Sequence, residues 1–359
     1  MQKNRSLFIA IGLLTLQVSF YYSLRFFPST VESLYSTGVY PFISKAMRLG
    51  LGWVPFSFGD LVYSVAIIMV IRWLWLSKRD LISFSRHARG RAGKRYTQLF
   101  LSLNIILALF HCMWGFNYYR EPLHEVLELD NKYSTEELKA VVYQLVFTSN
   151  KLHEQLQKTD SLPVTFTRSQ SEIFDLAPIA FKNIDHIYPA LDYGNSSIKE
   201  SLLTMPLSYM GYSGYLNPLT GEAQTNAWIN NYKTPVLTLH EMSHQLGFAK
   251  ENEANFIAII AGMNHDDLHF QYSASIFALR YCINELYLKD PKAYEEIRPL
   301  IRDGVFENYK ELQDFWSQYK GVIEEVSQVT YDTYLKANNQ PGGMETYSYV
   351  VALIVNYYK

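Results

Sequence analysis

The sequence predicts a mainly α-helical protein with a small β component, in which three N-terminal transmembrane helices precede an extracytoplasmic α+β domain. Three observations predict this class. Three long apolar segments occur before residue 120, the chain becomes more polar after it, and helical periodicity covers most of that second part. We therefore divide the chain into a membrane domain, residues 1–119, and a globular domain, residues 120–359.

The composition agrees with a chain that is partly membrane-embedded and partly globular. Charged residues make up 18% of the 359 residues, below the roughly 25% that is usual for soluble domains. The mean hydropathy of -0.08 is too low for a polytopic transporter. The net charge of -2 gives no reason to expect a nucleic-acid partner. With only two cysteines, a disulfide framework is not expected.

Each apolar segment is long enough to cross a bilayer, which takes about 20 residues. The segments are residues 6–24, 59–76 and 96–119. No small-residue cleavage site follows the first, so we expect a retained anchor and not a signal peptide. Aromatic residues near the segment ends suggest belts at the membrane surface, namely Trp73, Trp75, Trp114, Tyr118 and Tyr119.

The basic residues between the segments predict the orientation. Residues 77–95 carry seven Lys/Arg and one acidic residue, whereas residues 25–58 carry three Lys/Arg. The positive-inside rule places the basic loop in the cytoplasm and everything after residue 119 on the other side. In a bacterium this predicts a multi-pass protein of the inner membrane with an extracytoplasmic C-terminal domain.

Local signals predict the elements of the globular domain. Ser134 and Glu137 form a capping box at the start of a helix over 134–157. Residues 162–167 alternate like a short strand, and residues 209–229 favour loop and strand. Helical patterns then run to the end of the chain, with breaks near residues 247, 265, 289 and 341. The apolar core of the last stretch, YSYVVALIVNYY, is too short to span a bilayer and predicts a packed helix.

One of these helices carries the stretch TLHEMSHQLGFAKENEAN, residues 238–255. His240 and His244 are four residues apart, so both imidazoles lie on one helical face and can bind one Zn²⁺. Glu241 follows the first histidine and stands where a general base for an attacking water is expected. Thr234 is the predicted N-cap of this helix and Gly247 its stop.

A hydrolytic zinc site needs a third protein ligand. Glu251 and Glu253 are the candidates if the chain turns back after Gly247. We favour Glu251, because Asn255 follows it by four residues and would hydrogen-bond to a zinc-binding histidine, as in glutamate-type zincins. A third histidine ligand would stand three residues after Gly247, in the pattern H-E-x-x-H-x-x-G-x-x-H. It is not expected here, because Lys250 occupies that position. The competing interpretation is an amphipathic helix whose histidines are satisfied in a core.

The chain resembles an uncharacterised family of bacterial membrane proteins that carries a domain of unknown function. The resemblance rests on WGFNYYREPL (114–123), SGYLNPLTGEAQTN (213–226), HEMSHQLGFAKENEANFIA (240–258) and the terminal aromatic stretch. It implies three N-terminal spans and a zincin-like domain with the activity of a gluzincin-like zinc metallopeptidase. It implies no substrate.

Further site residues are predicted less sharply. Residues 211–226 precede the histidine helix, where zincins place an edge strand that binds extended substrate. Glu222 and Asn226 in this stretch either contact substrate or are structural. Tyr272, His265 or His269 could supply a donor to an oxyanion, and we favour Tyr272 because a phenol stays neutral at pH 7.

These features predict a membrane-anchored zinc-dependent metallopeptidase that hydrolyses peptides or proteins of the cell envelope. Its expected partners are the peptide substrate and the lipid bilayer. Two alternatives stay open: a zinc amidase acting on cell-wall peptides, and an inactive zincin that serves as a scaffold or binding subunit in an envelope complex. The intact Glu241 argues against the inactive alternative.

Overall fold

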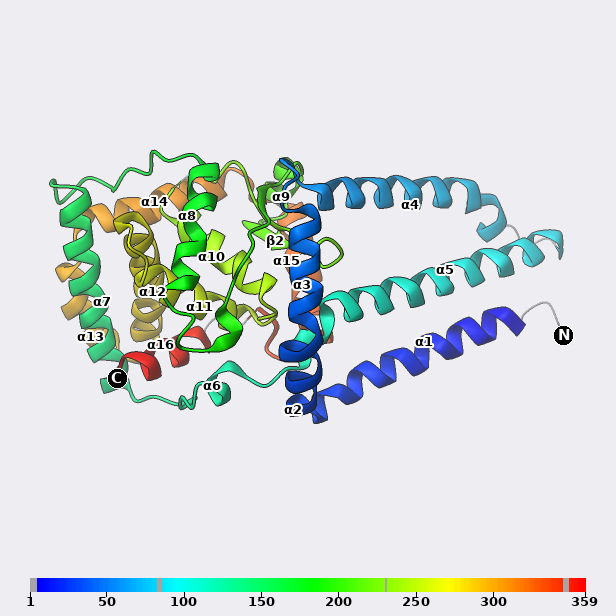
Figure 1. The fold of residues 1–359 in the computed structure, drawn as a ribbon. Helices are drawn as coiled ribbons and strands as arrows, with labels where there is room; N and C mark the ends of the chain where they lie inside the picture. Colours follow the sequence, from blue (N-terminus) through cyan, green and yellow to red (C-terminus); the bar gives the residue numbers. More distant parts are fainter. Residues whose placement is uncertain (1–4, 83–85, 230, 345–348) are drawn as a thin grey trace.

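The computed structural model describes residues 5–82, 86–229, 231–344 and 349–359. Three long helices leave one side of a globular, mainly helical domain (Figure 1). They are α1 (Arg5–Ser23), α4 (Phe58–Ile82) and α5 (Arg86–Met113). The first continues through the short 3₁₀ helix η2 (Leu24–Phe26). The stretches Arg5–Phe26, Phe58–Lys78 and Arg91–Met113 are long and apolar enough to cross a membrane. The three predicted membrane-length helices are therefore present.

The third of these helices ends earlier than predicted. It stops at Met113 and is followed by a 3₁₀ helix, η4 (Gly115–Tyr119). Trp114, Tyr118 and Tyr119 are buried, at 2–6% exposed. The prediction that these three aromatic residues form a belt facing the membrane surface is therefore wrong, because their side chains are packed inside the protein.

Polar side chains join α1 to α5. The Gln17 amide donates to the backbone oxygen of Asn104 at 3.2 Å, and the Asn104 amide donates to the backbone oxygen of Ala10 at 3.0 Å. The His111 ring stacks on Tyr21 with 3.7 Å between ring centroids. His111 therefore adds an aromatic contact between the two helices.

Residues 28–51 are helical, although the sequence suggested only a loop between two spans. They form α2 (Pro28–Val31), the π-helix η3 (Glu32–Val39) and α3 (Tyr40–Leu51). Helix α3 runs across the direction of the long helices, against the globular domain (Figure 1). The Tyr40 and Ser44 hydroxyls donate to the backbone oxygen of Gln245 at 2.9 and 2.7 Å. This segment is therefore docked on the globular domain, next to the end of the histidine helix.

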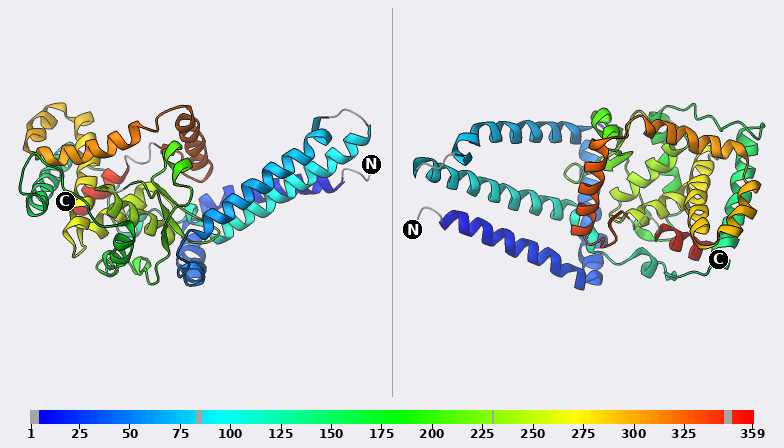
Figure 2. Two further views of the ribbon diagram at one scale, coloured as in Figure 1. Left: turned by 90° about the horizontal axis from the view of Figure 1, so that it is seen from above. Right: turned by 180° about the vertical axis from the view of Figure 1, so that it is seen from behind.

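The globular domain is built from helices around one apolar core. Helix α11 is buried along nearly its whole length and packs against α10 and α12. Helix α7 packs along α12, and α16 packs against both α11 and α12 (Figures 1 and 2). The α-helices are α6 (Leu123–Val126), α7 (Thr135–Leu156), α8 (Gln170–Lys182), α9 (Thr204–Tyr209), α10 (Lys233–Gln245), α11 (Glu251–Met263), α12 (Leu268–Lys289), α13 (Pro291–Ile297), α14 (Asp303–Ser317), α15 (Val322–Ala337) and α16 (Val350–Tyr358).

Most predicted elements of this domain are present. The capping box is formed, since the Ser134 hydroxyl accepts from the Glu137 amide and the Glu137 carboxylate accepts from the Ser134 amide. The terminal stretch is a packed helix, α16. The strand predicted at 162–167 is wrong. Val164 pairs both of its backbone groups with the side-chain amide of Asn308, at 3.0 Å each, so no neighbouring strand is needed.

The small β component is a three-stranded sheet in the order β1-β3-β2. Its strands are β1 (Ile198–Glu200), β2 (Gly214–Leu216) and β3 (Ala223–Thr225). Strand β3 runs parallel to β1 and antiparallel to β2. Helix α10 packs against β2 and β3. In the described part of the chain, β2 is thus an edge strand that lies beside the histidine helix. It falls within residues 211–226, where an edge strand was predicted.

Candidate metal centre

Helices α10 and α11 form a tight helical hairpin around Gly247. This glycine has φ +90°, a left-handed conformation that favours glycine and ends α10. Lys250 then takes an extended conformation and caps α11. The start of α10 differs from the prediction. The helix begins at Lys233, and Thr234 lies in its first turn and donates its hydroxyl to the backbone oxygen of Ile229 at 3.0 Å.

The hairpin brings His240, His244 and Glu251 together. The two Nε2 atoms lie 3.1 Å apart, and the Glu251 carboxylate oxygens lie 3.2 Å from His240 Nε2 and 3.7 Å from His244 Nε2. A tetrahedral ion with metal–ligand bonds of 2.0–2.1 Å needs ligand atoms roughly 3.3 Å apart. One ligand atom from each of the three side chains lies within 4.8 Å of the other two, so the three residues could hold one metal ion.

Neighbouring groups fix the orientation of this cluster. His244 Nδ1 lies 2.7 Å from the backbone oxygen of Phe248, so Nδ1 carries the proton and the lone pair of Nε2 faces the cluster. The indole of Trp114 donates to the backbone oxygen of His244 at 2.9 Å. The Tyr331 hydroxyl donates to Glu251 Oε1. Such outer contacts orient ligands at metal sites.

The charges in the cluster are strongly coupled. Burial, followed by the neighbouring His240, lowers the pKa of His244 to about 4. Burial alone would raise the pKa of Glu251, but its contacts with His240, His244 and Tyr331 hold it at about 2. Glu251 is therefore a carboxylate and His244 a neutral imidazole near pH 7. Those are the protonation states that a metal ion requires of these two ligands. Burial lowers the pKa of His240, but the contact with Glu251 outweighs burial and raises this pKa above its ordinary value, so an ion would compete with a proton on His240.

Glu241 lies beside the cluster without joining it. Its side chain is buried, and Oε2 has no hydrogen-bond partner among the described residues. Burial raises the pKa of Glu241 to about 8, and a dication at the cluster would lower it. A Cβ at Gly214 of β2 would stand 2.7 Å from Glu241 Oε1, so only glycine fits there. The carboxylate thus faces the edge strand.

Lys233 is a site residue that the sequence reasoning missed. Its ammonium donates to the Ser213 hydroxyl at 2.7 Å, next to the start of β2. Burial and Arg280 lower the pKa of Lys233 to about 8, although Glu241 and Glu251 act in the opposite direction. Lys233 precedes His240 by seven residues, a spacing that keeps both on one face of a helix. That spacing was the signal available in the sequence.

Two further predicted site residues, Glu253 and Asn255, do not contact the histidines in this structure. Glu253 Oε1 accepts from the Leu123 amide at 2.9 Å and from the Lys250 ammonium at 3.2 Å, which turns it away from the cluster. Asn255 is buried, but its Nδ2 has no partner among the described residues, and neither has Nδ1 of His240. The hydrogen bond predicted from Asn255 to a histidine is therefore not formed, and Tyr331 contacts the ligand set instead.

The predicted oxyanion donors are also placed elsewhere. Tyr272 is fully buried, and its hydroxyl donates to Asn308 Oδ1 at 2.9 Å, so it is a core residue and not a site residue. His265 Nδ1 accepts from the Asp267 amide at 2.8 Å. His269 lies beside the same aspartate, 3.6 Å away. The sequence could not exclude these residues because their distance from the cluster depends on how α12 packs.

Glu222 and Asn226 have structural roles. Glu222 is fully buried, forms an ion pair with Lys199 at 2.6 Å and accepts from the backbone amides of Phe58 and Gly59 at the start of α4. Asn226 donates to the Ser208 hydroxyl at 2.8 Å. Of the two interpretations left open for this pair, the structural one therefore fits.

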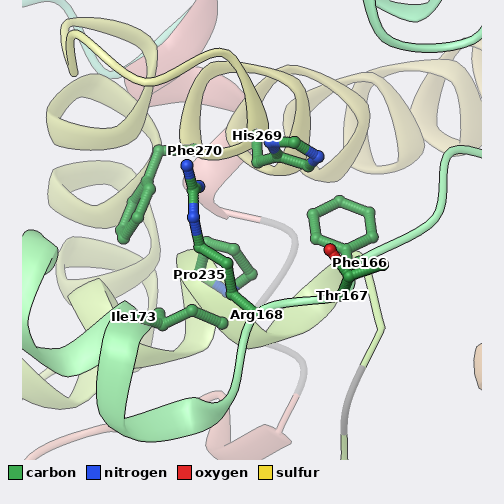
Figure 3. A pocket seen from close by; sticks show the side chains of 7 residues that line it. All are labelled: Phe166, Thr167, Arg168, Ile173, Pro235, His269 and Phe270. Carbon is green, nitrogen blue, oxygen red and sulfur yellow. The ribbon is translucent and has the colours of Figure 1, made fainter.

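A small depression at the other end of α10 is not a second site. It is lined by Phe166, Thr167, Arg168, Ile173, Pro235, His269 and Phe270 (Figure 3). It encloses about 10 Å³, room for at most one water molecule. Its one permanent cation, Arg168, is paired with Asp267 at 2.6 Å. None of the three clustered ligands lines it.

Comparison with known proteins places the chain in a family. A family model described as "Protein of unknown function (DUF3810)" matches residues 35–355. The chain belongs to the DUF3810 family. The expected kinship with an uncharacterised membrane family is therefore confirmed. The DUF3810 match begins within η3, so it includes α3 and two of the membrane-length helices together with the globular domain. Neither curated proteins nor solved structures gave a match.

Proposed function

We propose that this DUF3810 protein is a membrane-anchored, gluzincin-like zinc metallopeptidase. His240, His244 and Glu251 would hold the ion, and Glu241 would act as the general base. The convergence of His240, His244 and Glu251 within 4.8 Å carries the proposal, together with the buried Glu241 carboxylate, whose Oε2 has no hydrogen-bond partner in the described part of the chain. A buried carboxylate oxygen without a partner is costly for stability, so its retention favours a chemical role over a structural one.

The surrounding residues suit peptide hydrolysis. A zinc ion at the cluster would polarise the scissile carbonyl and make water more acidic. Glu241 would take a proton from the attacking water and deliver it to the leaving amine. An extended peptide would pair with the open edge of β2, which places its backbone beside Glu241 at Gly214.

Two donors near the cluster replace Tyr272 as candidates for stabilising an oxyanion. The Lys233 ammonium acts electrostatically on Glu241 and Glu251 and is tied to Ser213, the residue before β2. The Tyr331 hydroxyl contacts Glu251 directly. Preorganised donors of this kind stabilise developing negative charge in a site that excludes water.

The proposed location is the bacterial inner membrane, with the globular domain outside the cytoplasm. All three long helices reach the globular domain with one end, and the end of α4 and the start of α5, which carry the basic residues, lie at the far end (Figure 1). The charge bias predicts that an alkaline phosphatase fused after residue 359 is active and one inserted at residue 89 is not. Activity only of the fusion at residue 89 would contradict this location.

Substrate profiling of the purified full chain tests the proposed function. A library of peptides, including cross-linked cell-wall peptides, is incubated with the protein before and after chelation and after return of zinc. We expect cleavage that chelation stops and zinc restores. Cleavage of cell-wall amides alone would favour the amidase. Cleavage that persists after complete zinc removal would contradict a zinc-dependent peptidase.

The ligand assignment predicts opposite results for two neighbouring glutamates. Glu251→Gln should lower zinc affinity by at least about 10-fold, because an amide oxygen is a poorer ligand than a carboxylate. Glu253→Gln should keep its zinc, because its carboxylate contacts Leu123 and Lys250 instead. Zinc content after dialysis against a weak chelator measures both. Loss of zinc only in the Glu253 variant would reverse the assignment.

A further inference from the structure

Helix α15 has one face against the metal cluster. Tyr331 in its middle donates its hydroxyl to Glu251 Oε1. One turn further, the Tyr334 hydroxyl accepts a 3.1 Å hydrogen bond from Tyr118, and Leu335 is fully buried. This helix is therefore a wall of the proposed site.

On the opposite face, the first half of α15 is apolar and exposed in the part of the chain that the structure describes. Val322, Ile323, Val326 and Val329 are 73%, 59%, 61% and 69% exposed. Positions 322, 326 and 329 follow the spacing of a single helical stripe. Exposed aliphatic residues are ordinary when scattered, but a continuous stripe indicates a surface with a partner.

The position of this stripe indicates the partner. Helix α15 lies on the side of the globular domain from which the long helices leave, and it runs across their direction (Figures 1 and 2). Its Tyr334 packs on Phe110 with 6.3 Å between ring centroids. Phe110 lies within the membrane-length stretch Arg91–Met113, three residues before its end. The helix is therefore level with the point where α5 would leave a bilayer.

A second apolar surface lies at the same level, on and just after α3. Phe42, Leu49 and Trp53 are 75%, 53% and 79% exposed. Phe42 and Leu49 lie opposite the face of α3 that docks on the globular domain through Tyr40 and Ser44. Tryptophan and phenylalanine beside basic residues are typical of helices that lie in a membrane surface.

From this arrangement we infer that the exposed face of α15 rests in the surface of the bilayer that the three long helices cross. The exposed charged residues Glu325 and Lys336 lie along one edge of the stripe, as polar residues do beside the apolar face of an amphipathic helix in the plane of the interface. The metal cluster then lies one helix away from lipid. If the cluster is the peptidase site proposed above, the substrates within its reach are peptide segments close to the membrane surface. This statement about substrates rests on the proposed function.

Spin-label accessibility tests the bilayer contact without any substrate. The full chain, with Cys112→Ser to remove its exposed cysteine, is reconstituted in lipid nanodiscs; Cys282 is buried and stays unlabelled. Single nitroxides are placed through Val326→Cys or Val329→Cys. The matched control is Leu288→Cys, a 76% exposed position of α12. Helix α12 lies across the globular domain from the long helices (Figure 1). Relaxation by oxygen, which concentrates in lipid, is compared with relaxation by a water-soluble nickel complex.

We expect the oxygen-to-nickel ratio at 326 and 329 to exceed that at 288 several-fold. A ratio at 326 and 329 equal to the control would overturn the proposal. Strong dipolar broadening between labels on different chains would also overturn it, because a second copy would then cover the stripe. The result is independent of catalysis, so failure of the peptidase proposal would not change it.

Discussion

Replacing Glu241 with glutamine should lower peptide turnover by about 10²–10⁴-fold, the usual contribution of a general base. The amide keeps the shape of the carboxylate but cannot accept the proton of an attacking water. Zinc content should stay unchanged, because Glu241 supplies none of the three clustered donor atoms. The measurement is kcat together with zinc content, on the best substrate found by profiling.

The control for this variant is Glu295→Gln, an exposed glutamate on α13, which should have wild-type turnover. Both variants replace a glutamate with a glutamine. A lower turnover in the Glu241 variant alone therefore reports the loss of the base and not a general effect of changing charge. Retained turnover in the Glu241 variant would remove this residue from the mechanism. Loss of zinc in the same variant would instead show that it is a ligand.

Replacing Arg120 with methionine should cause the largest loss of stability outside the metal cluster, about 3–5 kcal/mol. The Arg120 guanidinium forms two hydrogen bonds with the Glu32 carboxylate, at 2.9 and 2.6 Å, and donates to the backbone oxygen of Gly247 at 3.1 Å. The two side chains are 1% and 10% exposed. The substitution leaves Glu32 as a buried charge without its main partner.

A double variant separates the cost of leaving the Glu32 charge buried without its partner from the loss of the Arg120 hydrogen bonds. Arg120→Met combined with Glu32→Gln should lose less stability than the sum of the single changes, because no uncompensated charge remains. Lys139→Met is the surface control, since Lys139 and Glu296 form a pair that is 29% and 65% exposed and is worth at most about 1 kcal/mol. Denaturant unfolding in detergent measures the two single variants, the double variant and the surface control. A loss for Arg120→Met no larger than for the surface pair would contradict the expectation.

The features predicted correctly from the sequence depend on short-range relations along the chain. The clustering of His240 and His244 follows from helical periodicity, and the reversal at Gly247 brings Glu251 back within a few residues. The membrane-length helices follow from runs of apolar residues. Each of these relations is visible in a window of about 20 residues.

The features that the sequence missed depend on contacts between distant segments. Tyr331 reaches Glu251 across 80 positions, and Tyr40 reaches Gln245 across 205. Nothing local distinguishes Tyr331 from Tyr272, and only the packing of α12 and α15 shows that the first contacts the cluster while the second is in the core. The docking of α3 was missed because the buried face of this helix carries Ser44 and Arg48, and such polar residues are typical of an exposed loop.

Elemental analysis of the purified full chain tests the central claim, a metal centre on His240, His244 and Glu251, most directly. Wild-type protein and His244→Ala are expressed, purified without chelator and measured side by side. The predicted result is about one zinc ion per wild-type chain and a loss of most of it in the variant. Equal, stoichiometric zinc in both proteins, or no metal in the wild-type protein even after incubation with zinc, would contradict it.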